Sequence, residues 1–333
     1  QANSDHSLLW LSLSAKIAFC VLVLLGLKEF QIWDSVREFI NYNPWRYLDI
    51  PFHELRMNPW WIRTGIVLPS LLVSEVTPLS TEMSFAIYAT MAVLLSIHLT
   101  VRTLTAVLGP SRSRTLVTTL FLLFLSCFMN GRICFAILGA SMLYAGHYAW
   151  FRGRLGTLAV TVINLLALML MTVSTGSFYV GTSVVFVFGI LAMRDPREGP
   201  AKGQVTLNSM FTLIPSIFLV IHQATLFNEK LARWHDGDYL MVVYHGPLKL
   251  IEEYIPSVPP ELLLCAVLVA AVVCGVSWFG FASSYPIADT FLATTVLIGI
   301  TCGVFGYSTL LTNMPGYILF GWTFLQRRGI VIA

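Results

Sequence analysis

Charged residues are scarce in this sequence. Asp, Glu, Lys and Arg together make up 11% of the 333 residues, hydrophobic residues make up 56%, and the mean hydropathy is +0.76. Because soluble domains carry about 25% charged residues, this deficit excludes an ordinary soluble domain and predicts an integral membrane protein. The net charge of +3 is spread over short loops and forms no basic and aromatic helix face, so we expect no nucleic-acid partner.

Paired cysteines and known catalytic motifs are also lacking. All six cysteines fall in apolar segments, no two form a CxxC pair, and none stands beside a histidine at metal-ligand spacing. These positions argue against a zinc site and against disulfides. No G-x-S-x-G, HExxH, P-loop or G-x-G-x-x-G motif stands in a workable context, so we expect no required cofactor.

What the sequence does contain is a series of apolar segments of helical length. A membrane-spanning helix needs about 20 predominantly apolar residues. The candidate spans are residues 8–29, 83–101, 115–129, 133–151, 155–175, 178–193, 205–227, 262–282, 287–307 and 315–325. We therefore predict an all-α, polytopic integral membrane protein, with about ten transmembrane helices in a single membrane domain over residues 1–333 and two polar loops on its outer face.

Basic residues occupy alternate connections between these spans. They are Arg102, Arg112 and Arg114; Arg152 and Arg154; Arg194, Arg197 and Lys202; and Arg327 and Arg328. All four sets fall on one face, which the positive-inside rule assigns to the cytoplasm. The opposite, outer face then receives residues 130–131, 174–177 and 228–260, together with the stretch around Asn313.

The segment 62–76 decides where the first polar loop lies. It is shorter than a usual span and is interrupted by Gly65 and Pro69, which favours a re-entrant helix. Residues 31–82 then form the first outer loop, on the same side as the second outer loop, 228–260. If residues 62–76 span the membrane instead, residues 31–61 are cytoplasmic.

The first loop combines aromatic, basic and acidic residues in a way that suits a sugar site. Trp33 and Trp45 can stack on the apolar faces of sugar rings, while a carboxylate such as Asp34 holds hydroxyl groups. The alternative for the tryptophans is an aromatic belt at the membrane–water interface. The candidate substrate-binding cations of the two outer loops are Arg37, Arg63 and Arg233.

The same loops hold the candidate catalytic residues, which are His53, Glu54, His235 and Asp34. A histidine with a pKa near 7 can take a proton from a sugar hydroxyl during attack. The run from His235 to Asp238 can instead hold a divalent cation through carboxylate oxygens. Neither pattern has a defined motif spacing, so ordinary surface-loop chemistry is the alternative for both.

Arg132 is the first candidate for a phosphate site, because it stands at the start of a predicted helix. The helix dipole disfavours a cation there, but the free backbone N–H groups of a first turn bind anions such as phosphate. The planar guanidinium adds a two-pronged donor for phosphate oxygens. The alternative is an interfacial arginine that extends to lipid headgroups.

Four polar residues within the spans have simpler interpretations. We expect Asn164 and Asn208 to form hydrogen bonds between helices. His98 and His147 lie near the cytoplasmic ends of their predicted helices, so we expect both at the membrane interface.

Several stretches of the N-terminal half occur in a characteristic order. A spanning helix leads to a polar loop with an early acid, Ile32-Trp33-Asp34, and then to NPWWIRTGIVLPSLL, MSFAIYATMAVLLS, NGRICFAILGASMLYAGHY and FRGR. Over residues 10–195 this arrangement resembles the EpsG-like and Wzy-type polymerases of bacterial surface polysaccharides. The Arg-rich repeat of some Wzy proteins is not found, and Ser174-Thr175 stands where the EpsG pattern has a histidine.

The resemblance implies a glycosyltransferase of the bacterial inner membrane that joins lipid-diphosphate-linked repeat units at the periplasmic face. It implies that Arg132 and Arg63 stabilise the departing diphosphate, and that His53, Glu54 or His235 deprotonates the acceptor. The implied partners are a lipid-linked oligosaccharide, membrane lipids, and a chain-length regulator or other assembly protein. The residues leave two alternatives open: a transporter or flippase of a lipid-linked or small polar substrate, and a structural subunit of a membrane complex.

Overall fold

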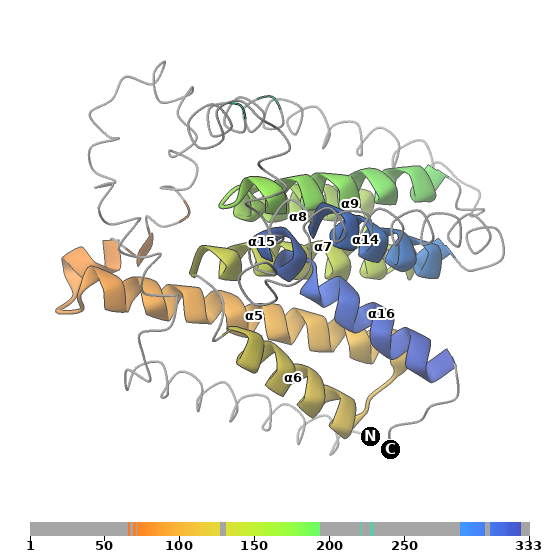
Figure 1. Cartoon of the computed structure of the whole chain (residues 1–333), viewed down its shortest axis with the longest axis horizontal. Helices are drawn as coiled ribbons and strands as arrows, with labels where there is room; N and C mark the ends of the chain where they lie inside the picture. The colour runs from red at the N-terminus through yellow and green to blue at the C-terminus, as the bar shows by residue number, and fades with distance from the viewer. Residues whose placement is uncertain are drawn as a thin grey trace, which may run out of the picture.

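The computed structural model describes residues 66, 69–70, 72–126, 131–193, 221, 228, 287–303 and 307–327. In this part of the chain all regular structure is helical and no strand occurs, which agrees with the all-α prediction. Figure 1 shows these helices packed beside one another in a bundle. The expected spans 8–29, 205–227 and 262–282 lie almost wholly outside the described residues, and so do the two polar loops apart from a few residues at their edges.

The longest described helix, α5 (Thr81–Leu108), has a cap at each end. The Ser80 hydroxyl oxygen accepts a 3.2 Å hydrogen bond from the Met83 N–H, which satisfies one of the open donors of the first turn. Gly109 follows the helix with φ of 82°, a conformation that glycine adopts without strain. Its N–H donates to the Thr105 carbonyl at 3.0 Å, so the local sequence specifies where α5 begins and ends.

The next helices along the chain are α6 (Arg112–Ser126), α7 (Gly131–Phe151), α8 (Thr157–Met171) and α9 (Thr175–Met193). Short connections place α6 beside α5, α8 beside α7 and α9 beside α8. Helix α7 occupies the centre of the described bundle, because it packs against α5 and α8 along its length and also contacts α9, α15 and α16. The predicted span 133–151 therefore corresponds closely to the central helix.

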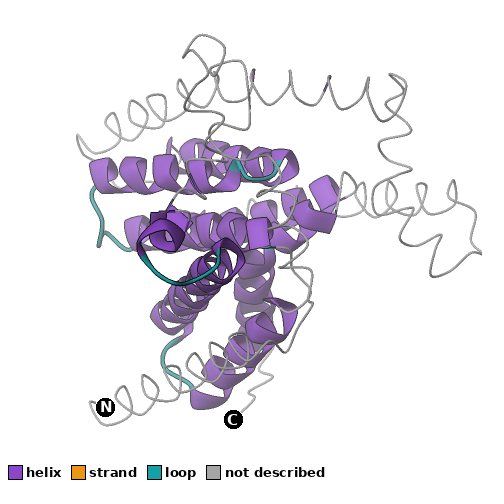
Figure 2. Cartoon of the chain, turned by 90° about the vertical axis from the view of Figure 1, so that its left-hand side faces the viewer, coloured by secondary structure: helices purple, strands orange, loops and turns teal. Residues whose placement is uncertain are grey.

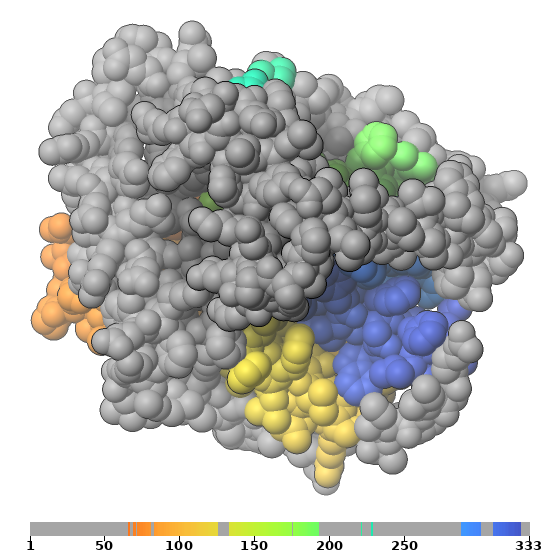
Figure 3. Space-filling model, viewed as in Figure 1, coloured from red at the N-terminus to blue at the C-terminus, as the bar shows by residue number. Residues whose placement is uncertain are grey.

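Three C-terminal helices pack on the same centre. Helix α14 (Ile287–Gly303) lies against α9, α15 (Tyr307–Thr312) against α7 and α9, and α16 (Met314–Arg327) against α7, α14 and α5. Figure 2 shows the bundle from its side, and Figure 3 shows α6 and α16 next to each other on one face. The Trp322 indole N–H of α16 donates to the Thr118 hydroxyl of α6 at 3.1 Å, which joins these two helices.

Of the expected re-entrant helix 62–76, residues 66, 69–70 and 72–76 are described, and all are helical. Ile66 is buried in the apolar cluster that contains Phe85 and Ile133, whereas Leu72 and Val76 are exposed. The helix gives way to a bend at residue 77, just before the cap of α5. That this segment re-enters rather than spans stays a prediction from its length.

Two of the described helices carry segments long and apolar enough to cross a membrane, Met83–Leu108 of α5 and Ile133–Phe151 of α7. Shorter apolar helices cover Thr157–Met171, Gly176–Ala192 and Ala288–Ile300. Large apolar side chains also point outward, such as Phe124 of α6 and Leu158 of α8, which are 65% and 73% exposed. Exposed apolar surface of this kind suits contact with lipid, in agreement with the two helices of spanning length.

Helices α7 and α8 approach each other closely through a glycine. A methyl group at Gly139 of α7 would lie 2.6 Å from the Ala167 carbonyl oxygen of α8 and 2.7 Å from the Cγ atom of Met171. Lipid provides no hydrophobic force between helices, so close contact of small residues is a main source of packing energy there. Gly139 therefore sets the distance between the central helix and its neighbour.

Candidate functional site

The basic turns meet at one end of the described bundle. A cavity of about 440 Å³ is lined by Arg102 near the end of α5 and by Arg152 and Arg154, which follow α7. A second cavity of about 360 Å³ beside it shares Arg152 and includes Arg327 at the end of α16. These four arginines therefore lie at one end of the described bundle, and that this end is the cytoplasmic face stays a prediction.

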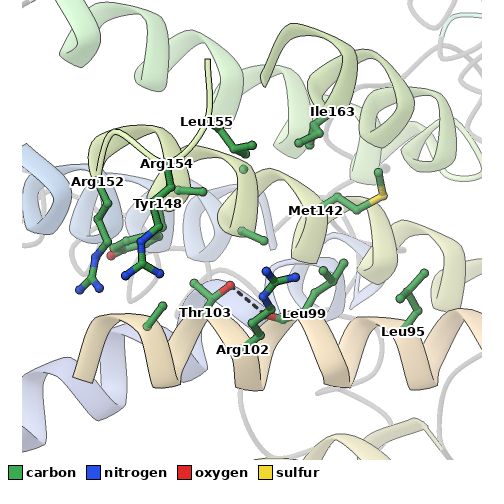
Figure 4. Close-up of a pocket in the computed structure, with 14 residues that line it drawn as sticks. Leu95, Leu99, Arg102, Thr103, Met142, Tyr148, Arg152, Arg154, Leu155 and Ile163 are labelled. Carbon is green, nitrogen blue, oxygen red and sulfur yellow. Dashed lines mark hydrogen bonds between the residues drawn. The ribbon is translucent and has the colours of Figure 1, made fainter. Parts of the chain in front are cut away.

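The first cavity, which we call the arginine pocket, lies between α5, α7 and the start of α8. Its walls are apolar, with Leu95 and Leu99 from α5, Met142 from α7, and Leu155 and Ile163 from the α8 region. Figure 4 shows the Arg152 and Arg154 side chains together at one end of these walls, with Arg102 farther along, beside Leu99. The pocket thus has an apolar interior and a strongly basic end.

The three arginines of the pocket have no acidic partner in the described part of the chain, where the ion pair present is that of Arg327 with Asp289. The Arg152 guanidinium donates to the Val107 carbonyl at 3.2 Å, which satisfies one of the open acceptors in the last turn of α5. Because a guanidinium has five donors, this bond leaves most of its capacity for an anion.

Arg114 differs from the pocket arginines, because its guanidinium is used inside the protein. It donates to the carbonyl oxygens of Leu108, at 3.3 Å, and Gly109, and to the side-chain oxygen of Gln326 at 3.4 Å. Partial burial lowers the pKa of Arg114 from its ordinary value, although arginine remains charged in proteins. Arg114 therefore completes the end of α5 and ties it to α16.

A second polar group lies in the core, around Asn313 in the turn between α15 and α16. The Tyr144 hydroxyl of α7 donates to the Asn313 side-chain oxygen at 2.7 Å, and the Asn313 amide donates to the Thr295 carbonyl of α14 at 2.9 Å. Both ends of the amide are occupied, so this cluster fastens three helices together. Asn313 is 0% exposed, and the expectation that the stretch around it lies on the outer face stays a prediction.

His147 lies in a buried aromatic cage. Its Nε2 atom is 2.8 Å from the side-chain oxygen of Asn164, and its ring stacks on Phe188 with centroids 4.0 Å apart. The carbonyl-type oxygen of Asn164 accepts this bond, so Nε2 carries the proton. The prediction that Asn164 forms a hydrogen bond between helices is confirmed. The prediction of an interfacial His147 was wrong, because packing of α8 and α9 covers this face of α7.

Of the residues predicted for the catalytic and substrate sites, the structure describes the position of Arg132 alone. Arg132 is the second residue of α7. The others lie outside the described residues: Asp34, His53, Glu54 and His235 as candidate catalytic groups, and Trp33, Arg37, Trp45, Arg63 and Arg233 as candidate substrate contacts. The proposed meeting of the two outer loops therefore stays a prediction.

The described residues contain no group of three or more His, Cys, Asp or Glu side chains that could hold a metal ion. The acidic run 235–238, the candidate for a divalent cation, lies outside them. Cys134, in the first turns of α7, is buried and forms no disulfide, as expected for a cysteine in an apolar segment.

The pocket arginines entered the sequence analysis as markers of topology, with no ligand assigned to them. Their grouping depends on α5 and α7 packing side by side, which places Arg102 opposite residues about 50 positions later in the chain. A signal was present in the sequence, since FRGR places two arginines around a glycine directly after an apolar helix. That signal alone does not distinguish a ligand site from a cytoplasmic turn.

A scan against protein-family models finds no match to this chain. Searches of curated proteins and of solved structures find none either. The resemblance to the EpsG-like and Wzy-type polymerases therefore rests on the order of sequence features, and the activity it implies is taken up below as a proposal.

Proposed function

We propose that this chain is a multi-pass glycosyltransferase of the bacterial inner membrane that polymerises lipid-diphosphate-linked oligosaccharide repeat units at the periplasmic face. Three features support the proposal. The described region is helical, with spanning-type helices; the sequence has no motif for a nucleotide-activated donor; and residues 31–63 combine aromatic, basic and acidic side chains. A lipid-diphosphate donor fits these features, because the energy for transfer is already stored in its sugar–phosphate bond.

The position of Arg132 carries the proposal. Helix α7 has 21 residues and is therefore about 30 Å long, with Arg132 in its first turn and Arg152 just beyond its last. Arg132 thus belongs to the end of α7 opposite the basic turns. The positive-inside rule assigns the basic turns to the cytoplasm, so the Arg132 end is expected outside. A first helical turn offers backbone N–H groups, and an arginine there adds a planar donor for a leaving diphosphate.

The reaction would transfer a glycan from one lipid diphosphate to a sugar hydroxyl on another. Arg132 and Arg63 would stabilise the negative charge that develops on the leaving diphosphate. His53, Glu54 or His235 would accept the proton of the attacking hydroxyl. The expected partners are the lipid-linked oligosaccharide and a chain-length regulator or other assembly protein.

The test is the length of surface polysaccharide in the native bacterium after deletion of the gene and complementation. We expect Arg132→Ala to lower polymerisation about 100-fold or more, as loss of a transition-state donor does elsewhere. Arg112→Ala is the matched control, because Arg112 also lies in a first helical turn but at the basic end. A normal ladder of chain lengths with Arg132→Ala, at equal protein level, would remove Arg132 from the mechanism.

Transport of a lipid-linked or small polar substrate is the second candidate. It is favoured by the interruption between α15 and α16, because transporters place discontinuous helices at their substrate sites. Against it, Asn313 is 0% exposed and its amide already bonds to Tyr144 and Thr295, so it is not presented to a substrate. Flipping of a fluorescent lipid-linked oligosaccharide by the purified protein in vesicles, without any polymer formed, would favour this candidate.

A further inference from the structure

We propose that the arginine pocket binds one anionic phospholipid from the membrane leaflet at the basic end. The lipid phosphate would lie between Arg102, Arg152 and Arg154, and one of its chains would follow the apolar wall formed by Leu99 and Met142. This lipid site is separate from the proposed glycan site, which belongs to the opposite end of α7. It does not depend on the proposed transfer reaction.

The charge of the pocket indicates an anion. Three guanidinium groups line one cavity, those of Arg152 and Arg154 just after α7 and that of Arg102 on α5, and within the described chain no carboxylate pairs with any of them. Positive charges that line one cavity without a carboxylate attract an anion into it. The planar guanidinium binds phosphate oxygens through two parallel hydrogen bonds, so phosphate is the anion that the three side chains fit best.

The shape and lining of the pocket indicate a lipid rather than a soluble phosphate. A volume of about 440 Å³ is within the range of ligand sites, whereas one phosphate ion would occupy the basic end alone. The remaining wall, from Leu95 to Ile163, is apolar and lies between two helices, one of them exposed along this side at Leu95. Basic pockets between membrane helices on the cytoplasmic side are suited to anionic headgroups.

The competing explanation is that these arginines contact the headgroup layer in general, as interfacial arginines commonly do. The two explanations predict different effects of substitutions on lipid binding. If the contact is general, it depends on charge alone, and every exposed arginine at this end contributes equally. A lipid held in the pocket depends on the pocket arginines in particular and also on the open space beside Ala145 and Ala149.

The experiment measures binding of phosphatidylglycerol to the purified full-length chain in detergent by native mass spectrometry. We expect one tightly retained phosphatidylglycerol per chain, little retention of phosphatidylcholine, and no competition from inorganic phosphate at millimolar concentration. Competition by inorganic phosphate would show that the occupant is a soluble anion and would overturn the lipid assignment. Equal retention of phosphatidylcholine would overturn the requirement for an anionic lipid.

Single substitutions separate the pocket from the surrounding surface. Arg102→Gln and Arg154→Gln should each weaken phosphatidylglycerol binding about tenfold or more, because each removes charge-assisted hydrogen bonds. Arg112→Gln is the matched control, since Arg112 is exposed at the same end and does not line the pocket. Equal losses for all three substitutions would show general headgroup contact and contradict the proposal. Arg152 is left intact, because its bond to Val107 also completes α5.

Filling the pocket tests its apolar part without any change of charge. Ala145→Phe and Ala149→Phe place a ring in the open space between α5 and α7 and should weaken phosphatidylglycerol binding at least as much as Arg102→Gln. Size-exclusion chromatography and circular dichroism show which variant remains folded, and one folded variant is sufficient. Unchanged binding in a folded variant would place the lipid outside the pocket. If neither variant folds, the arginine substitutions decide the proposal alone.

Discussion

The Tyr144 hydroxyl donates a 2.7 Å hydrogen bond to the side-chain oxygen of Asn313 and joins the centre of α7 to the turn between α15 and α16. These residues are 169 positions apart in the chain, and both are buried. Non-helical backbone inside a membrane protein is tolerated only where protein groups satisfy it. At this turn the Asn313 N–H donates to the Leu310 carbonyl and the Asn313 carbonyl accepts from the Tyr317 N–H, so local bonds satisfy the backbone. The Asn313 side chain ties the turn to α7 and α14.

Replacement of Asn313 is expected to destabilise the fold. Asn313→Ala leaves the Tyr144 hydroxyl without its acceptor and should lower the free energy of unfolding by about 1–3 kcal/mol. Tyr144→Phe removes one bond and keeps the ring, so its cost should be smaller, about 0.6–1.5 kcal/mol. Unfolding in detergent, followed by circular dichroism against rising dodecyl sulfate, measures both. A neutral Asn313→Ala would show that the cluster does not stabilise this turn.

A methyl group at Gly316 is expected to clash with the same tyrosine. A Cβ atom there would overlap the Tyr144 hydroxyl oxygen and lie 2.6 Å from Cζ. Gly316→Ala should therefore cost about 1–3 kcal/mol through overpacking. Gly321→Ala on the same helix is the matched control, since nothing lies within 4 Å of the added methyl group. The control should stabilise α16 by about 0.5–1 kcal/mol, because alanine favours a helix over glycine.

The clash at Gly316 also predicts a coupling. Tyr144→Phe deletes the oxygen that the new methyl group meets but keeps the Cζ atom, so it relieves part of the clash. The double variant should therefore be somewhat less destabilised than the sum of the two single ones. Thermal unfolding of the four proteins in one detergent gives this coupling energy. Strict additivity would mean that the backbone around Gly316 moves aside and that the close approach to Tyr144 is not required.

The proposed topology predicts opposite labelling of two engineered cysteines. A membrane-impermeant maleimide should label Trp45→Cys in intact cells, and should label Arg112→Cys only after the inner membrane is opened. Of the native thiols, Cys134 is buried, and the wild-type chain measures the background from all six. Labelling of both positions from the same side would separate residues 31–61 from the outer face and remove the first loop from the glycan site.

The sequence predicts several local features of the described bundle correctly. The apolar segment 133–151 corresponds to α7, because a run of apolar residues between polar turns has few conformations available other than a helix. Asn164 was assigned to a hydrogen bond between helices, and it bonds to His147. The candidate catalytic and sugar-binding residues of the outer loops remain predictions, since apart from the backbone of Arg132 they lie outside the described residues.

The amino-acid sequence by itself determined that the described chain is helical and apolar, and that basic residues alternate between connections. Those properties depend on bonds within each helix and on the composition of each segment. The tertiary structure alone decided which polar residues are buried together, as with Tyr144 and Asn313, and that Arg102 shares a pocket with Arg152 and Arg154. The physical reason is that burial and electrostatic environment come from helices distant in the sequence, and their packing has no local signature.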